Sequence, residues 1–488
     1  MQVPSSSAYD TSIGTGVDAN GYAVLPLRSG AHRYFVSSAS GSDGNGCAAA
    51  QQPGTPLRSI AAAAACLQNG AGDQLLVAEG TSYSEGLPNL DSRAGYSAQY
   101  PTVIQSYDPA DPLNEAKHGR AANGRRPVVN TGANDQAITC CTGSPASHLA
   151  IRGFDISPGN RPDMVVSFIG SNNDVLIENN IFRYTQLTFD KYTFPRATNH
   201  IVRKNAFYGE WSATAHAQGI YDSGTDNLVI EDNVFWHNGW KLGASRDDTA
   251  ANGGPTMFRH AIYQQLDTNA ITRRNLMADA AADGGQYRGN STITENVYID
   301  NPTAIGAGGG YNYNVARPDG VDLEVSYNAI LGDADINSSN PRGFGISTAN
   351  GRPGSSAHHN LLIRTRNPNG VNVYAFNTEA AFNQPSYMDW NNNRTYLWAA
   401  SGSTHFDIGG SFPAQNHPTF NNNVWDDPAS GTNTNVGGAA LPNPLTAAQL
   451  YVALGCTDKQ TCLMKMVETP ELGWAVKARA ILWQGYGL

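Results

Sequence analysis

Residues 177–182, IENNIF, decide the fold, because their pattern of an apolar residue, two polar residues, asparagine and two apolar residues returns along the chain. Copies are VRKNAF at 202–207, IEDNVF at 230–235, TRRNLM at 272–277, ITENVY at 293–298 and VSYNAI at 325–330. AHHNLL at 357–362 is a weaker copy, and LAIRGFDI at 149–156 fits an earlier unit with Gly153 at the turn. Such repetition indicates a solenoid, whose units bury their apolar faces by stacking on one another.

The repeat unit itself predicts strands. Most steps between successive asparagines are 21 to 32 residues long, and each holds short alternating stretches with a polar turn residue at a fixed place. This pattern is typical of a parallel β-helix rather than a helical repeat. Asparagine tolerates a left-handed turn and its amide can bond to turn backbone, so we expect a structural ladder and no catalytic role. The predicted ladder comprises Asn180, Asn205, Asn233, Asn275, Asn296, Asn328 and Asn360.

Composition agrees with many short strands and narrows the classes of partner. Glycine is frequent (51 residues), only 15% of residues are charged, and long helical runs are missing. The net charge of -10 argues against a nucleic-acid partner, because such binding needs clustered lysine and arginine. No apolar run approaches the length of a membrane span, so we expect no membrane partner.

Six cysteines indicate the compartment. We expect local disulfides between Cys47 and Cys66 and between Cys456 and Cys462, which fit an oxidising compartment. Cys140 and Cys141 are adjacent, and either a vicinal disulfide or two free thiols fits them. The first ten residues have no basic and apolar leader pattern. We therefore expect a secreted or periplasmic protein from which a leader has been removed.

The segment from Tyr34 to Gly86 carries a family resemblance. Its layout, YFVSSASGSDGNG followed by GTPLRSI, GDQLLV and GTSY, resembles the first coil of secreted right-handed parallel β-helix proteins, above all polysaccharide lyases of the pectate-lyase-like superfamily. The matching positions are Tyr34, Val36, Gly41, Asp43, Gly54, Thr55, Pro56, Ile60, Gly72, Asp73, Gly80, Thr81 and Tyr83. The resemblance implies an all-β, single-stranded, right-handed parallel β-helix with a capping helix at 59–68. It leaves the substrate open, because the superfamily hosts lyases, glycosidases, epimerases, tailspikes and adhesins.

Three regions follow from these patterns. Residues 1–33 are expected to form an irregular leader along the outside, and residues 34–440 the β-helix. In residues 441–488, LTAAQLYVALGC and GWAVKARAILWQGYGL have apolar residues at helical spacing. Because a solenoid end exposes apolar core and strand edges, we interpret this tail as a helical C-terminal cap.

One repeat step is anomalous. Asn233 and Asn275 are 42 residues apart, and the excess is the insertion 236–258. Insertions in solenoids form loops on one face, often the binding face. This one holds the candidates His237, Trp240, Lys241, Arg246, Asp247 and Asp248. We interpret Trp240 as a possible sugar-binding wall, because an aromatic face packs on the C–H face of a pyranose ring. An ordinary solvated loop is the alternative.

Three strands flank the insertion: QGIYD at 218–222, HAIYQ at 260–264 and GGQYR at 284–288. Aligned on tyrosine, they place Tyr221, Tyr263 and Tyr287 in one column beside Asp222, Gln264 and Arg288. Strand alternation puts neighbouring columns on opposite faces, so a bend is needed for all of them to face outward. A structural aromatic stack is the alternative for the tyrosines.

We expect β-elimination on a uronic-acid polymer. This chemistry needs a cation for the substrate carboxylate, a base for the C5 proton and an acid for the leaving oxygen. Arg288 is the predicted cation, His260 the base and Tyr263 the acid or second base, with Lys241 or Arg246 as alternative cations. The expected substrate-binding residues are His216, Tyr221, Asp222, His237, Trp240, Arg246, Gln264 and Tyr287. The resemblance adds Ca²⁺ as an optional cofactor, for which Asp222, Asp247 and Asp248 are the candidates.

Two other functions remain open at this point. A glycoside hydrolase would use two carboxylic acids, which Asp222 with Asp247, Asp248 or Asp283 could supply. A non-enzymatic adhesin or tailspike-like module would bind carbohydrate without cleaving it. In all three cases the expected partner is a polysaccharide, acidic in the case of the lyase. The sequence predicts no oligomeric state.

Overall fold

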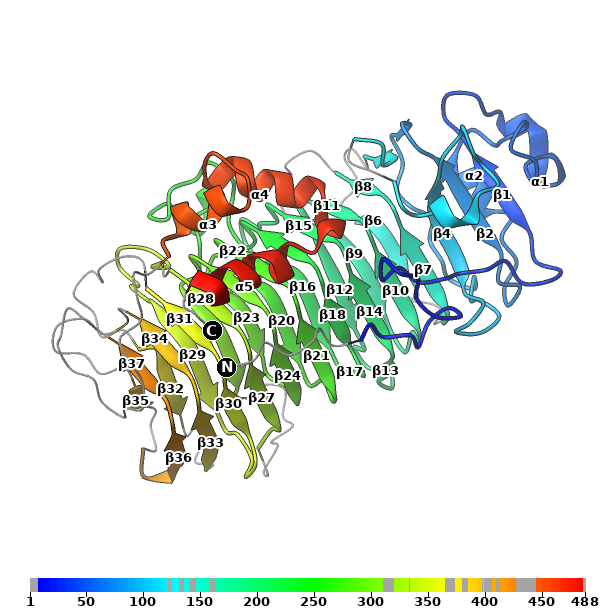
Figure 1. Cartoon of the computed structure of the whole chain (residues 1–488). Coiled ribbons are helices and arrows are strands. Elements are labelled where there is room, and N and C mark those ends of the chain that lie inside the picture. The colour runs from blue at the N-terminus through cyan, green and yellow to red at the C-terminus, as the bar shows by residue number, and fades with distance from the viewer. Residues whose placement is uncertain are drawn as a thin grey trace.

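The computed structural model describes residues 8–121, 124–130, 136–140, 146–157, 164–309, 320–332, 334–364, 374–379, 385–396, 398, 406–409, 413–426 and 445–485. These residues form a solenoid with three sheets, to each of which most coils add one strand (Figure 1). Every pairing between the strands of these sheets is parallel, which confirms the predicted parallel β-helix. Among the described residues, none of the helices is long and apolar enough to cross a membrane.

We number the sheets in the order in which each coil visits them. Sheet 1 contains β6 (Gln136–Cys140), β9 (Met164–Ile169), β12 (Thr185–Asp190), β16 (Gln218–Ser223), β20 (His260–Gln265), β23 (Asp283–Tyr287), β26 (Thr303–Gly308), β29 (Phe344–Ala349), β32 (Phe376–Glu379) and β35 (Phe406–Gly409). Sheet 2 contains β1 (Arg33–Val36), β2 (Gln74–Ala78), β4 (Thr102–Tyr107), β7 (Leu149–Arg152), β10 (Val175–Glu178), β14 (His200–Arg203), β18 (Val229–Glu231), β21 (Ala270–Arg273), β24 (Ser291–Thr294), β27 (Leu323–Ser326), β30 (Ser356–His358), β33 (Ser386–Asn391) and β36 (Asn416–Asn421).

Sheet 3 contains β3 (Ser82–Tyr83), β5 (Val128–Val129), β8 (Asp155–Ile156), β11 (Ile181–Arg183), β15 (Ala206–Tyr208), β19 (Val234–Trp236), β22 (Leu276–Ala278), β25 (Val297–Ile299), β28 (Ala329–Leu331), β31 (Leu361–Ile363), β34 (Arg394–Tyr396) and β37 (Val424–Asp426). A small sheet pairs β13 (Ala197–Thr198) with β17 (Thr225–Asp226). The helices are α1 (Gly46–Ala49), α2 (Ile60–Ala64), α3 (Ala447–Ala453), α4 (Lys459–Glu468) and α5 (Trp474–Gly485), and the 3₁₀ turns are η1 (Asp43–Asn45), η2 (Glu115–Lys117), η3 (Ala250–Asn252), η4 (Pro413–Gln415) and η5 (Pro470–Leu472).

The asparagine ladder lies inside the turn between sheets 2 and 3. Nδ2 of Asn275 donates to the carbonyl of Ile230, 2.8 Å away, and its Oδ1 accepts from the backbone N–H of Asn233 at 2.9 Å. The same bonds confirm each predicted rung, and the ladder continues to Asn393 and Asn423. The left-handed residue, however, is the one before each asparagine, such as Arg274 with φ 54°. That residue makes the bend, while the asparagine stays inside to bond the next coil.

Helix α2 caps the first coil as predicted, although it ends earlier than residue 68. The Ser59 side chain accepts from the N–H of Ala62 and so caps the helix start. Ile60 and Ala63 are buried in the main core, which closes the solenoid at this end. The disulfide between Cys47 and Cys66 ties this region together, and Cys456 and Cys462 form the second predicted disulfide. Cys141 lies outside the described residues, and with it the question of a pair with Cys140.

Residues 8–32, the N-terminal strap, run along the outside of sheet 2 (Figure 1). Ile13, Ala23 and Leu25 pack against an apolar column on that face, formed by Val103, Ala150, Leu176, Ile201 and Val229. Charged side chains of the next column bind the strap backbone, as when the N–H of Ala23 donates to Glu178. The strap thus covers an apolar surface of the coils.

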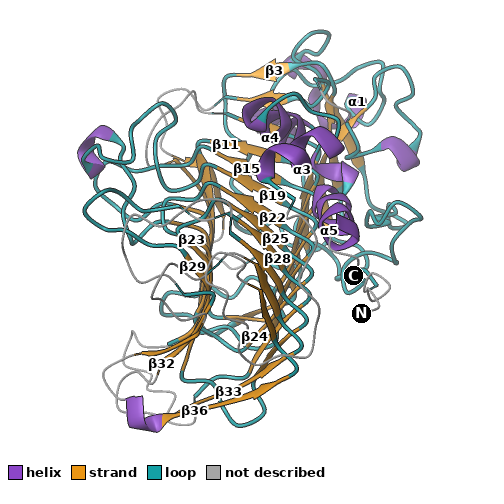
Figure 2. Ribbon diagram, turned by 60° about the vertical axis from the view of Figure 1, so that its left-hand side comes forward, coloured by secondary structure: helices purple, strands orange, loops and turns teal. Residues whose placement is uncertain are grey.

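Residues 445–485, the C-terminal tail, are helical as predicted but lie along the side of the solenoid. Helix α4 packs against β15 and β19, and α5 packs against β25. Figure 2 shows these helices beside β15, β19, β22 and β25 of sheet 3, whereas β23 and β29 of sheet 1 lie away from them. The outer face of sheet 3 is apolar, with Leu276 and Val297 buried beneath the tail. This apolar face, rather than the end of the solenoid, is what the tail helices cover.

Candidate functional site

The outer face of sheet 1 brings several predicted residues together. In β20 both Ala261 and Ile262 belong to the main core, so two consecutive side chains face inward. Because regular alternation holds on either side of this bend, His260 and Tyr263 lie on the same outer face. This bend brings His260 and Tyr263 to one face, but it does not turn Gln264 outward, because Gln264 still alternates with Tyr263.

His260 has an acidic neighbour from the following coil. Its Nδ1 lies 3.3 Å from the Oδ2 of Asp283, the first residue of β23. The backbone N–H of Asp283 lies 3.4 Å from the same nitrogen, so two tautomers are compatible with this contact. The His260 side chain is 2% exposed and that of Asp283 is 13% exposed. This contact fixes the imidazole plane and turns Nε2 away from Asp283.

Tyr263 is the centre of the group. Its ring centroid lies 5.2 Å from that of His260 and 5.8 Å from that of Tyr221 on the preceding coil. Tyr221 and Tyr263 are register partners, which confirms this part of the predicted column. The guanidinium carbon of Arg288 lies 5.7 Å from the Tyr263 ring centroid. An imidazole, two phenols and a guanidinium thus share one outer surface.

Arg288 is held by neutral partners. Its Nε donates to Oε1 of Gln286 and its Nη1 donates to the carbonyl of Gly309, each at 3.2 Å. Within the described part of the chain, Arg288 forms no ion pair with an acidic side chain, unlike most of the buried arginines. Its charge therefore stays available to an anionic ligand.

Two predicted residues face inward: Gln264 alternates with Tyr263 along β20, and Tyr287 follows because the GGQYR strand pairs one residue away from the expected register. Tyr263 pairs with Gln286, and Gln264 pairs with Tyr287. A slip of one residue moves a side chain to the opposite face. Tyr287 is fully buried with its hydroxyl 3.1 Å from that of Tyr298, and burial raises the pKa of both phenols. Gln264 is likewise buried, so neither residue binds a ligand on the outer face, and the prediction for both is corrected.

Asp222 also points into the coil, which corrects its assignment to substrate, calcium or hydrolytic chemistry. It is fully buried, accepts from Thr225 Oγ1 at 2.7 Å and shares a hydrogen bond with Asp267. Burial raises the pKa of Asp222. Burial and the charge of Asp222 raise the pKa of Asp267 well above its ordinary value. The pair is an internal hydrogen-bonded contact at the turn between sheets 1 and 2.

In the insertion 236–258, the residues that the sequence predicted to be functional instead anchor the loop to the neighbouring coil through Asp279. His237 Nδ1 lies 3.3 Å from Asp279 Oδ2, and Arg246 Nη2 donates to Asp279 Oδ1 at 2.9 Å. Trp240 is 7% exposed and donates from Nε1 to the Asp279 carbonyl. Burial alone would raise the pKa of Asp279, but the His237 hydrogen bond and the charges of Lys459 and Arg246 hold it well below its usual range. The predicted sugar-binding role of His237, Trp240 and Arg246 is therefore replaced by a structural one.

The remaining charged residues of the insertion do not assemble a calcium site. Lys241 Nζ lies 5.1 Å from the Trp211 ring centroid, which is a cation–π distance. Asp247 accepts from the N–H of Ser338 and Asp248 from that of Ser245. Among the described residues, no three His, Cys, Asp or Glu side chains form a group that could hold a metal ion. The proposed ligands Asp222, Asp247 and Asp248 thus have separate structural partners.

The structure adds residues that the sequence interpretation missed. Phe258, the last residue of the insertion, is 55% exposed, and its ring lies 5.5 Å from that of His216 with 13° between the planes. The charge of His260 contributes, after burial, to the lowered pKa of His216, which places His216 beside the site. The sequence interpretation considered Asp283 only as a possible carboxylic acid of a hydrolase, and it assigned no role to Gln286. The register of Gln218 with His260 predicts the contact of His216 with Phe258, since each lies two residues upstream.

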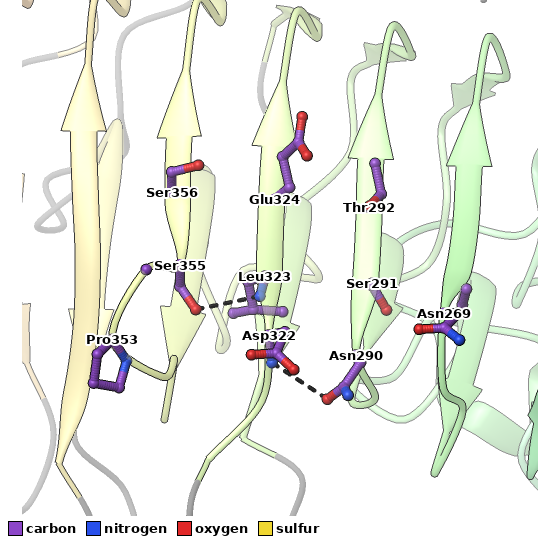
Figure 3. Close-up of a pocket in the computed structure, with 12 residues that line it drawn as sticks. Asn269, Asn290, Ser291, Thr292, Asp322, Leu323, Glu324, Pro353, Ser355 and Ser356 are labelled. Carbon is purple, nitrogen blue, oxygen red and sulfur yellow. Dashed lines mark hydrogen bonds between the residues drawn. The ribbon is translucent and has the colours of Figure 1, made fainter.

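A polar pocket of about 350 Å³ lies on a different surface. It opens on the outer side of sheet 2, over β21, β24, β27 and β30 (Figure 3). Asn269, Asn290, Thr292, Asp322 and Glu324 line it. Asn290 Oδ1 accepts from the N–H of Asp322, and Arg352 pairs with the Asp322 carboxylate at 3.0 Å. The pocket has no residue in common with the group around His260.

Comparison with known proteins gives similarities among solved structures alone. No family model matches the chain, and no curated protein matches it. The chain is similar to GH136 lacto-N-biosidase from Eubacterium ramulus (14% identity, TM-score 0.44, 80% of this chain and 68% of that one). It is also similar to the catalytic unit of GH87 alpha-1,3-glucanase from Streptomyces thermodiastaticus (13%, 0.38, 86% and 72%) and to alginate lyase from Paenibacillus sp. (13%, 0.33, 70% and 97%).

Proposed function

We propose that this protein is a polysaccharide lyase that cleaves a uronic-acid polymer by β-elimination on the outer face of sheet 1. The observation that carries the proposal is Arg288, an arginine without an acidic partner among the described residues, beside Tyr263 and His260. A guanidinium in this position can bind a substrate carboxylate through two hydrogen bonds. The two disulfides support a secreted or periplasmic location.

Each side chain has one role in the reaction. Arg288 binds the uronate carboxylate and stabilises the negative charge that develops when the neighbouring carbon loses its proton. Nε2 of His260 takes the C5 proton, and that electron pair forms the C4–C5 double bond as the C4–O bond breaks. The Tyr263 hydroxyl gives its proton to the leaving oxygen. Atoms and charge balance with one unsaturated uronate and one new sugar end.

Asp283 is a positioning residue in this scheme. The Asp283 carboxylate, 3.3 Å from Nδ1, favours the tautomer with hydrogen on Nδ1, in which Nε2 carries the free electron pair that the base needs. The histidine is almost buried, so a substrate touches only the edge of the ring, next to Tyr263. A base shielded from bulk water and held by a carboxylate keeps its geometry during the reaction.

A panel assay tests the proposal. Polygalacturonate, alginate, hyaluronan and the neutral glucan laminarin are incubated with the protein while ultraviolet absorbance and reducing ends are followed. Absorbance of an unsaturated uronate from any acidic polymer supports the lyase. Reducing ends without that absorbance point to a glycoside hydrolase, for which Asp283 is one candidate carboxylate. Retention of a polymer without cleavage would identify a binding module instead.

A further inference from the structure

The polar pocket on sheet 2 lies where the turn that leads from sheet 1 to sheet 2 is short. Residues 264–270 of one coil are matched by residues 287–291 of the next, because the ends of the two segments pair, so this turn is two residues shorter. Two coils further on, the matching segment 348–355 is three residues longer than 287–291. A short turn flanked by longer ones leaves a hollow, which Asn269 lines on one side and Pro353 on the other (Figure 3).

The pocket also coincides with a change along one row of outward-facing residues on sheet 2. Beside the strap this row is apolar, and its last two apolar members are Val229 and Ile271. The strand register continues the row through Thr292, Glu324 and Ser356, all of which line the pocket (Figure 3). The apolar part of the row is covered by the chain itself, whereas the polar part offers hydroxyl and carboxylate groups to a polar ligand.

The carboxylates make the pocket acidic. Asp322 pairs at 3.0 Å with Arg352, which does not line the pocket, and the Asp322 side chain is still 61% exposed. Glu324 is 48% exposed and accepts from Ser326 Oγ at 3.0 Å. Its one ionic contact among the described residues is His358, 3.8 Å away, and burial lowers the pKa of that imidazole, which favours its neutral form. An acidic lining disfavours uronates and other anions.

The lining holds a ligand through hydrogen bonds, since none of its residues is aromatic. Nδ2 of Asn269 donates to Oδ1 of Asn227 at 3.4 Å, and Oδ1 of Asn269 has no hydrogen-bond partner among the described residues. Oδ1 of Asn290 accepts from the N–H of Asp322, which fixes that amide in place. The volume of about 350 Å³ lies at the lower end of the range for small-molecule sites, which suits a ligand as small as one sugar ring.

We propose that this pocket is a second carbohydrate-binding site, which takes one neutral sugar unit on a face of the solenoid other than that of His260. The carboxylates of Asp322 and Glu324 accept hydrogen bonds from the sugar hydroxyls, and the hydroxyl groups of Thr292 and Ser356 complete the contacts. Bonds to ionised acceptors are stronger than bonds between neutral groups, so the two carboxylates contribute most of the affinity. The site can hold a glycan whether or not sheet 1 cleaves one.

Titration calorimetry and saturation-transfer NMR test the site with the methyl glycosides of glucose, galactose, mannose and N-acetylglucosamine. We expect at least one of them to bind, and Glu324→Ala to raise its Kd about tenfold through the loss of a charge-assisted bond. Thr292→Trp fills the pocket and should abolish binding. Asp389→Ala and Thr419→Trp are the matched controls in the same row beyond the pocket, and they should leave Kd unchanged. Methyl glucuronide should bind at least tenfold more weakly than methyl glucoside.

Each other outcome counts against the proposal. Binding that persists in both Glu324→Ala and Thr292→Trp would place the sugar elsewhere, and no binding of any of the four glycosides would overturn the site outright. Equal affinity for methyl glucuronide and methyl glucoside would contradict a preference for neutral sugars. Calcium chloride is the remaining probe, because Ca²⁺ binding that Glu324→Ala abolishes, without binding of any glycoside, would replace the sugar with a cation. None of these measurements depends on cleavage, so failure of the proposed lyase reaction and failure of this site are separate results.

Discussion

Nδ1 of His260 lies 3.3 Å from a carboxylate oxygen of Asp283, although 23 residues separate the two in the chain. The contact exists because one full coil brings the first residue of β23 beside the first residue of β20. In the proposed reaction this contact decides which imidazole nitrogen is free to take a proton.

Replacing that carboxylate tests its positioning role. Asp283→Asn keeps the shape of the side chain but lets the amide bond to Nδ1 in either tautomer. We expect kcat on the degraded polymer to fall about 100-fold, with a smaller change in KM and an unchanged melting temperature. His260→Ala should lose at least as much. Full activity of the His260→Ala variant would exclude His260 as the base.

Arg288 offers a test of substrate charge. Arg288→Ala should lower kcat/KM on an acidic polymer about 1000-fold, because the developing negative charge loses its partner. Arg288→Lys should recover part of the loss, since an ammonium group cannot bind a carboxylate in the same two-pronged way. Arg352→Ala, on the sheet 2 surface, serves as the control for loss of one positive charge. Equal losses in the alanine variants at 288 and 352 would argue against a specific carboxylate contact.

The ladder predicts a large stability effect at Asn275, which lies in the turn between sheets 2 and 3. Asn275 bonds to the backbone of Ile230, Arg273 and Asn233, so Asn275→Ala leaves several buried groups without partners. We expect the free energy of unfolding to fall by about 3 kcal/mol or more, measured by urea denaturation. Asn421→Ala, which removes an exposed bond to Asn391, should change it by less than about 1 kcal/mol. Similar losses in both variants would contradict the ladder's role.

The buried Asp222 and Asp267 pair predicts a pH dependence of stability. Both pKa values are raised by burial, so the folded protein keeps protons that the unfolded chain releases above the ordinary carboxyl pKa. The contribution of the pair is therefore full below that ordinary pKa and is lost as pH rises toward and through the raised values. Between pH 4 and pH 8, the melting temperature of the Asp267→Asn variant should fall less than that of the wild type. A steeper loss in the variant would show that the pair is ionised in the folded state.

The sequence was informative where one residue type repeats at one position of every coil. Asn180 and its copies fixed the coil boundaries, and from them the strands and the parallel arrangement followed. The register of the sheet 1 strands was harder to predict, because tyrosine occurs both outside the coil, as Tyr263, and inside it, as Tyr287. An alignment on tyrosine therefore shifted β23 by one residue and exchanged inside for outside.

The prediction of a sugar-binding site in the insertion was wrong for a different reason. A tryptophan with neighbouring charged residues has the composition of a sugar-binding wall. In the structure, however, Asp279, 39 residues after Trp240, binds the tryptophan and its charged neighbours. Which side chains meet across such a sequence separation depends on how the next coil folds back beside the insertion, and local composition does not show this. Phe258 was overlooked because a lone aromatic residue at a loop end gives no pattern.

The strap and the tail also bear on the order in which the protein can be made. Arg273 binds the backbone of Ala8, which leaves the ribosome 265 residues earlier, and Glu468 pairs with Arg183, made 285 residues before it. Coils can stack on one another as they emerge, since each needs only its neighbour. The apolar flank of sheet 3, however, stays bare until the last helices arrive. During synthesis, and in any product that lacks the tail, this exposed apolar flank is the surface through which two chains would aggregate.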